Sequence, residues 1–383
     1  MFQFATATKI VFGAGSLAEL PRLVAGMGQR ALLVLGDSER FGARTEDLCA
    51  STGVTVHKAH VSGEPTVENV LALVEAAREA GVELVIGVGG GSVIDGAKAV
   101  AALLANPGDP LDFLEVIGRG RPLERAPLPF VAVPTTAGTG AEVTKNAVLA
   151  STEHAVKVSL RSDSMLPRVA LVDPELTLTL PPAITAATGL DALTQVLEPF
   201  VSRNANPITD ALSREGMARA ARGLRRAYHD GSDLEARTDM ALVSLFGGIT
   251  LANAKLGAVH GFAGPIGGMF PAPHGAVCAR LLPLVVERNI AALRARAPDS
   301  PVLGRYDEVA RILTGRGSAR ADDAAAWLRE LVHELAVPPL GRYGLAAAHV
   351  SEVVQKAKRA SSMQGNPIVL TDDELARTLE AAI

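Results

Sequence analysis

Three consecutive glycines between an apolar run and a helical pattern constrain the fold of this chain more than any other feature. Leu84–Val88 has the composition of a buried strand, and the segment 89–92, Gly-Gly-Gly-Ser, leads directly from it into a helical pattern. Glycines let the backbone approach a ligand closely, and a helix start offers unpaired N–H groups and a positive dipole end. The segment therefore predicts a strand–loop–helix unit that binds a pyrophosphate.

This loop fits neither of two common nucleotide-binding fingerprints. Lys98 is not followed by Ser or Thr, as a P-loop requires, and Ser92 stands where a Rossmann loop has its third glycine. Ser92 is expected to cap the helix or to donate to a phosphate, and Asp95 to support the helix dipole, fix the loop or touch the ligand. The residues predicted to hold the cofactor here are Gly89, Gly90, Gly91, Ser92 and Asp95.

Strand-like runs alternate with helical patterns in the first half of the chain. The expected strands are Ala31–Leu35, Val54–Lys58, Leu84–Val88, Phe130–Val133, Val156–Leu160 and Val169–Val172. Apolar residues at 67, 70, 71 and 74 mark one face of a helix between two of them. This alternation predicts an α/β domain with a parallel sheet, over residues 1–178.

The remainder, residues 179–383, is predicted to be an all-α domain. Ala-rich helical patterns begin after Pro181-Pro182 and few β-branched runs interrupt them. The expected helices cover about 183–198, 207–228, 234–256, 276–297, 303–314, 320–335 and 346–358.

Charge and composition exclude several classes of protein. The 37 basic and 41 acidic residues leave a net charge of −4, which argues against a broad nucleic-acid surface. Cys49 and Cys278 cannot form a disulfide framework and are expected to be reduced thiols. The first residues lack a signal-peptide pattern, and no run approaches the ~20 apolar residues of a membrane span. We therefore expect a cytoplasmic protein that does not enter a membrane.

A second loop with polar side chains follows the Phe130–Val133 strand. The loop contains two glycines and three threonines, Thr135, Thr136 and Thr139, whose hydroxyls suit hydrogen bonds to a ribose or an adenine. All three are predicted to contact the cofactor.

Four residues in the second half have the chemistry of a metal site. Asp191 and Gln195 are four residues apart in a helical pattern, so they share one helix face. His260 and His274 follow downstream, separated by a Gly/Pro-rich bend. One carboxylate, two imidazoles and a carboxamide oxygen are plausible ligands for a divalent cation.

Four segments together resemble the iron-containing (group III) alcohol dehydrogenase family. The matching segments are GGGSVIDGAKAVA at 89–101, PTTAGTGAEVT at 134–144, GLDALTQVLE at 189–198 and VHGFAGPIGGMFPAPHG at 259–275. The resemblance implies NAD(P)-dependent interconversion of small alcohols and aldehydes or ketones beside a divalent metal, usually iron or zinc. It also implies a homodimer or a higher homo-oligomer.

Carried over by position, Asp191, His260 and His274 match the family's metal ligands and form the predicted catalytic set. Gln195 stands where the family usually has histidine, and Gly264 where many members have another histidine near the substrate. An oxygen donor at 195 should favour Mn²⁺ or Mg²⁺ relative to Zn²⁺ and Fe²⁺. The resemblance also places Asn146 and Phe262 in the substrate cleft and Lys157 beside the cofactor.

Two other functions share these residues. In a reductase of the maleylacetate type, which needs no tightly held metal, His260 and His274 would polarise an oxo-acid carbonyl directly. A catalytically inactive dinucleotide-binding protein would keep the glycine loop but has no need of Asp191 and the two histidines.

The cofactor preference depends on the end of the strand Ala31–Leu35. Asp37 is expected to accept hydrogen bonds from a ribose and to repel a 2′-phosphate, which favours NAD. The family's discriminating acid aligns with Gly36, however, and Arg40 lies nearby to neutralise a phosphate. NAD is the predicted cofactor, with NADP as the alternative.

Overall fold

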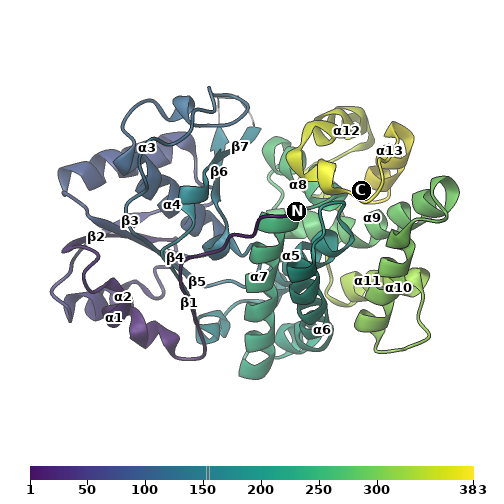
Figure 1. Cartoon of the computed structure of the whole chain (residues 1–383), viewed down its shortest axis with the longest axis horizontal. Coiled ribbons are helices and arrows are strands. Elements are labelled where there is room, and N and C mark those ends of the chain that lie inside the picture. Colours follow the sequence, from purple (N-terminus) through teal and green to yellow (C-terminus); the bar gives the residue numbers. More distant parts are fainter. Residues whose placement is uncertain (152, 155) are drawn as a thin grey trace. The chain divides into compact units, whose positions relative to one another are not determined.

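The computed structural model describes residues 1–151, 153–154 and 156–383, which divide into two compact units (Figure 1). The sheet unit comprises Ala5–Thr136 and Gly140–Leu178. The helical unit comprises Met1–Phe4, Ala137–Thr139 and Thr179–Ile383.

A parallel sheet forms the centre of the sheet unit. Among the described residues it has six strands in the order β1-β8-β5-β4-β2-β3, and every neighbouring pair is parallel. The strands are β1 (Ile10–Phe12), β2 (Arg30–Leu35), β3 (Thr55–His60), β4 (Leu84–Gly89), β5 (Phe130–Pro134) and β8 (Val169–Val172). The parallel α/β fold predicted for this part of the chain is confirmed.

Alternating side chains bury both faces of this sheet. In β2, Leu33 packs on one face with helices α1 (Leu20–Val24) and α2 (Gly42–Ala50). The next residue, Val34, packs on the other face with α3 (Val67–Glu79) and α4 (Gly91–Ala105). Because both faces are covered, the strands consist of continuous apolar residues.

Two strands lie outside the main sheet. β6 (Asn146–Ser151) and β7 (Val156–Arg161) pair antiparallel as a separate two-stranded sheet. The apolar pattern at 156–160 correctly predicts a strand, but neither β6 nor the short edge strand β1 was expected. β6 alternates buried and half-buried residues and begins with a polar Asn, so its apolar run is too short to stand out.

The helical unit is built around α5 (Pro182–Val201), whose residues from Gly189 to Val201 are all buried. Its apolar side chains share one core with those of the later helices. The remaining helices are α6 (Pro207–His229), α7 (Leu234–Ala254), α8 (Ala258–Met269), α9 (His274–Arg296), α10 (Pro301–Thr314), α11 (Ala321–Glu334), α12 (Val350–Arg359) and α13 (Asp372–Glu380).

Helix α8 corrects the expectation of a Gly/Pro-rich bend between the two histidines. Most of that stretch is helical, and only residues 270–273 connect it to α9. Glycine and proline lower helix propensity, but burial overrides propensity here. At Gly261 a methyl group would lie 2.7 Å from the flexible end of Met363 and 3.3 Å from its Cβ, so glycine lets α8 lie close to Met363.

Within the described residues, no single helix is long and apolar enough to cross a membrane. Helices α7 and α8 satisfy that test of length and composition only as a pair, and the pair is bent by 100°.

Candidate active site

The glycine loop connects β4 directly to α4. β4 is completely buried and ends at Gly89, Gly90 is the N-cap residue, and α4 begins at Gly91. The N–H groups of the first helical turn have no partner within the helix and lie at its positive end, which suits a pyrophosphate. A methyl group at Gly90 would lie 3.5 Å from Thr136, so the protein itself has room for it. At Gly89 a methyl group would come within 2.6 Å of Val93.

The polar residues of α4 have different roles from one another. Ser92 is not the helix cap, because Gly90 occupies that position; its predicted role as a phosphate donor stays a prediction. Asp95 accepts a hydrogen bond from the backbone N–H of Val148 at 3.1 Å, and burial raises its pKa to about 6. Asp95 therefore fixes strand β6 to the helix that follows the glycine loop.

Lys98 is a structural residue of this unit. Its buried ammonium donates to the carbonyls of Ala141, Thr144 and Asn146 at 2.8–3.0 Å. These bonds account for an unusual buried cation and leave it no role as a phosphate-binding lysine.

The second loop lies beside the first in the sheet unit. The N–H of Thr135 donates to the carbonyl of Gly89 at 2.9 Å, and Thr136 flanks Gly90. This places two of the predicted cofactor residues next to the glycine loop. Thr139 is half-buried and belongs to the helical unit. Lys157 forms an ion pair with Glu64 at 2.9 Å, which gives it a structural partner.

Asp37 follows β2, the strand that pairs with β4. The register aligns Leu35 with Val88, so the chain leaves both strands at the same edge of the sheet. Asp37 is exposed there and accepts a hydrogen bond from the Ser62 hydroxyl.

A cluster of potential metal ligands lies in the helical unit. Asp191 comes from the middle of α5, His260 from the first turn of α8 and His274 from the first residue of α9. Asp191 Oδ1 lies 3.3 Å from His260 Nε2 and 3.8 Å from His274 Nε2. The structure thus brings together three of the four residues predicted as metal ligands, although they are far apart in the sequence.

Cys278 is a fourth member of this cluster that the sequence analysis did not identify. It lies one turn after His274 on α9, and its Sγ is 3.6 Å from His274 Nε2. One donor atom from each of Asp191, His260, His274 and Cys278 lies within 4.8 Å of the others. The spacing of four residues between His274 and Cys278 was the available sequence signal.

Two buried oxygens at the site lack a hydrogen-bond donor. Among the described residues, neither Asp191 Oδ1 nor Gln195 Oε1 accepts a hydrogen bond. The amide nitrogen of Gln195 donates to the carbonyl of Gly138 at 3.1 Å, which orients the side chain. Buried polar atoms are nearly always satisfied, so these two oxygens fit a site that receives a cation.

Glu198 fixes the orientation of His260. It lies seven residues after Asp191 on α5; its Oε2 accepts from His260 Nδ1 at 2.7 Å and its Oε1 from the Val259 N–H at 2.8 Å. A carboxylate can only accept, so Nδ1 carries the proton and Nε2 is the donor atom that faces Asp191. This is the arrangement in which a carboxylate holds a metal-binding histidine.

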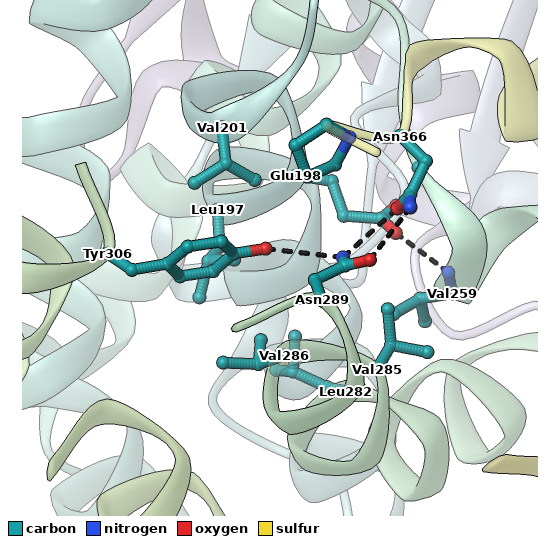
Figure 2. Close-up of a pocket in the computed structure, with 12 residues that line it drawn as sticks. Leu197, Glu198, Val201, Val259, Leu282, Val285, Val286, Asn289, Tyr306 and Asn366 are labelled. Carbon is teal, nitrogen blue, oxygen red and sulfur yellow. Dashed lines mark hydrogen bonds between the residues drawn. The ribbon is translucent and has the colours of Figure 1, made fainter. Parts of the chain in front are cut away.

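A small pocket lies on the other side of Glu198 (Figure 2). Asn289 donates to the Tyr306 hydroxyl at 3.2 Å and to Asn366 Oδ1 at 3.1 Å, and Asn366 donates back to Asn289 at 2.8 Å. Figure 2 shows this network beside Glu198. Since its members satisfy one another, the network lines the pocket without offering a reactive group.

The electrostatics of the cluster favour a positive charge. Burial alone would raise the pKa of Asp191, but His274 and His260 outweigh it and lower that pKa. Burial alone would lower the pKa of His260, but Cys278, Asp191 and Glu198 raise it well above its usual value. Burial raises the pKa of the Cys278 thiol to about 12. A bound divalent cation supplies the positive charge that this acceptor-rich site otherwise obtains from a proton.

Two residues expected in the substrate cleft have other surroundings. Asn146 is half-buried at the start of β6, and its carbonyl accepts from Lys98. Phe262 has an exposed fraction of 0% and packs in the core of the helical unit. Among the described residues the side chain of Phe262 contributes to packing, and its place beside the substrate stays a prediction.

The residues present fit both a nucleotide and a metal ion. One unit has a glycine loop at a helix start, and the other has a carboxylate–imidazole cluster with unpartnered buried oxygens. Together these features define a metal-dependent oxidoreductase that uses a dinucleotide.

Sequence profiles identify the family. Residues 7–174 match the profile described as "Iron-containing alcohol dehydrogenase", and residues 185–383 match "Fe-containing alcohol dehydrogenase family, C-terminal". The chain is 35% identical to long-chain-alcohol dehydrogenase 1 of Geobacillus thermodenitrificans, over 97% of this chain and 94% of the relative.

Solved structures agree with this assignment. A crystal structure of 1,3-propanediol oxidoreductase matches with a TM-score of 0.92 and 31% identity over 100% of both chains. Sulfoacetaldehyde reductase from Bifidobacterium kashiwanohense, solved in complex with NAD+, matches with a TM-score of 0.87 and 28% identity, over 100% of this chain and 98% of that one.

The chain belongs to the iron-containing alcohol dehydrogenase family. It is an oxidoreductase that acts on CH–OH groups with NAD(P) and a divalent metal. The predictions of an enzyme and of these two cofactors are confirmed.

Proposed function

We propose that Asp191, His260 and His274 bind the metal and that the glycine loop binds the dinucleotide, for oxidation of a small alcohol or reduction of its carbonyl product. The observation that carries this proposal is the convergence of the three side chains around the unpartnered Asp191 Oδ1. Gln195 is proposed as a further oxygen ligand because its Oε1 is buried and accepts no hydrogen bond within the described residues.

The protein's own residues position the reactants. When bound, the divalent metal polarises the substrate oxygen as a Lewis acid, and the nicotinamide donates or accepts the hydride. Glu198 keeps the proton of His260 on Nδ1, and the Gly138 carbonyl holds the amide of Gln195. The start of α4 binds the pyrophosphate through backbone N–H groups. Gly264 offers no side chain that could move a proton, so water or a ribose hydroxyl serves that purpose.

Cofactor preference, location and assembly are part of the same proposal. We propose NAD as the preferred dinucleotide because Asp37 follows the strand next to β4. The two free, buried cysteines support a reducing location such as the cytoplasm. A homodimer or higher homo-oligomer, which the family resemblance implies, belongs to this proposal; among the described residues β1 is an edge strand with one neighbour and offers a second copy an edge to pair with. Sedimentation equilibrium tests the last point.

The decisive experiment separates metal binding from dinucleotide binding. Asp191→Asn keeps the size of the side chain, and we expect it to abolish metal content and turnover while NAD(P) affinity stays nearly unchanged. His260→Ala should do the same, and Asp322→Asn, at an exposed position, is the matched control. Full activity of a metal-free preparation would reject the proposal in favour of the oxo-acid reductase.

A further inference from the structure

The position of Cys278 fits that of a metal ligand. Cys278 is completely buried. Its Sγ lies 3.6 Å from Nε2 of His274, which is one turn earlier on α9. A buried cysteine alone is an ordinary core residue. Here it borders a buried carboxylate, Asp191, whose Oδ1 accepts no hydrogen bond from any described residue and lies within the same cluster.

Three of the donor–donor distances are close to those around a bound metal ion, and all the donors lie within 4.8 Å of one another. Nitrogen, oxygen and sulfur ligands bound tetrahedrally to Zn²⁺ lie about 3.3–3.6 Å from one another, given bond lengths of about 2.0–2.3 Å. The structure has 3.3 Å between His260 and Asp191, 3.8 Å between His274 and Asp191, and 3.6 Å between Cys278 and His274. Small side-chain adjustments would bring all four donors to one ion.

Charge balance also favours the sulfur. A metal-bound histidine is neutral, so Asp191 is the one negatively charged group among these three ligands, and Glu198 acts on the metal only through the ring of His260. A thiolate would add a second negatively charged ligand to a dication in this buried site. On binding, the Sγ–H bond breaks, a sulfur–metal bond forms and the proton passes to water.

We propose that the Cys278 thiolate is a metal ligand of this protein, together with Asp191, His260 and His274. This inference rests on the metal-dependent function proposed above. It has a consequence for metal choice, because a soft thiolate favours Zn²⁺ and Co²⁺ over Mn²⁺ and Mg²⁺. The carboxamide oxygen of Gln195, taken alone, favours Mn²⁺ and Mg²⁺ over Zn²⁺ and Co²⁺.

Cobalt tests the ligand directly and without an activity assay. The full-length apoprotein is titrated with Co²⁺; equilibrium dialysis measures bound cobalt, and near-ultraviolet absorbance detects a sulfur-to-cobalt charge-transfer band. We expect the band in the unaltered protein, in Cys49→Ser and in Gln195→Ala, and its loss in Cys278→Ser. Cys49 is the matched control because it is the other buried free cysteine. Zn²⁺ affinity of Cys278→Ser should fall by about tenfold or more, while Mn²⁺ affinity changes less.

The outcomes distinguish this inference from the function. Bound cobalt without the band, or a band that persists in Cys278→Ser, overturns the cysteine ligand but leaves the metal-dependent function in place. Failure of the unaltered protein to bind cobalt or zinc overturns both. If Cys278→Ser unfolds, Cys278→Ala provides the same comparison, with its thermal transition checked by circular dichroism. A band that persists in Cys278→Ala also overturns the cysteine ligand.

Discussion

Glu198 Oε2 accepts a hydrogen bond from His260 Nδ1 at 2.7 Å, while the opposite ring nitrogen of His260 lies 3.3 Å from Asp191. One imidazole is therefore fixed from behind by one carboxylate and directed towards another. This relationship sets which nitrogen of His260 is available to a metal, and it makes Glu198 a positioning residue.

The first prediction concerns Glu198. Glu198→Gln keeps the shape but weakens the acceptor for His260 Nδ1, and loss of such a partner typically lowers metal affinity by about 10–100-fold. We expect a fall of that size in Zn²⁺ affinity, measured by competition with a chromophoric chelator. NAD(P) affinity should not change. Glu330→Gln, at an exposed position, is the control; equal affinities in the two variants would show that Glu198 only packs.

The second prediction concerns Gln195. Gln195→His replaces a carboxamide oxygen by an imidazole nitrogen, which Zn²⁺ and Fe²⁺ bind more strongly. We expect tighter Zn²⁺ binding in dialysis and a higher ratio of Zn²⁺ to Mn²⁺ affinity. Gln195→Leu, which has neither donor atom, should bind both metals more weakly. If metal affinity is the same in all three proteins, the side chain at 195 is not a ligand.

The third prediction uses two neighbouring glycines with different surroundings. Gly90→Ala has room within the protein, so we expect a normal thermal transition but weak NAD(P) binding, because the methyl group enters the space of the pyrophosphate. Gly89→Ala meets Val93 at 2.6 Å and should lower the thermal transition instead. Titration calorimetry measures the NAD(P) affinity of each variant, and scanning calorimetry measures its thermal transition. Unchanged NAD(P) affinity of Gly90→Ala would reject the loop assignment.

The sequence was sufficient for the parts of the fold that have a strong local pattern. Buried strands of a parallel sheet are continuous apolar runs, and β2, β4 and β5 were found for that reason. Helix α8 was missed because its glycines and Pro265 argue against a helix, and its burial among other helices stabilises it.

The same distinction applies to the site. Asp191 and Gln195 share a helix face, which spacing alone reveals, and Glu198 continues that face seven residues after Asp191. The function of Glu198 became clear only from the structure, in which α8 places His260 next to Glu198. Cys278 lies one turn after His274, a spacing visible in the sequence, but its closeness to Asp191 depends on the packing of α9 against α5, which spacing does not encode. Family position indicates a neighbourhood and not the direction of a side chain, so it did not reveal that Phe262 is completely buried.

The last prediction concerns the choice between NAD and NADP. Asp37 follows β2, whose neighbour β4 carries the glycine loop, so its carboxylate lies at the sheet edge where a dinucleotide bound at that loop would extend. Its hydrogen bond from the Ser62 hydroxyl holds the carboxylate in place. A fixed negative charge there accepts the ribose hydroxyls and repels a 2′-phosphate. We therefore expect a higher kcat/KM with NAD than with NADP.

Asp37→Asn removes the charge, keeps an oxygen that can accept from Ser62, and should shift the ratio of kcat/KM values towards NADP by about tenfold. Asp47→Asn, an equal change of charge at an exposed position on α2, should leave the ratio unchanged. Gly36 works against this expectation, because glycine at the end of the strand leaves room for a phosphate that Arg40 could neutralise. A tenfold preference of the unaltered enzyme for NADPH would mean that Gly36 and Arg40 outweigh Asp37.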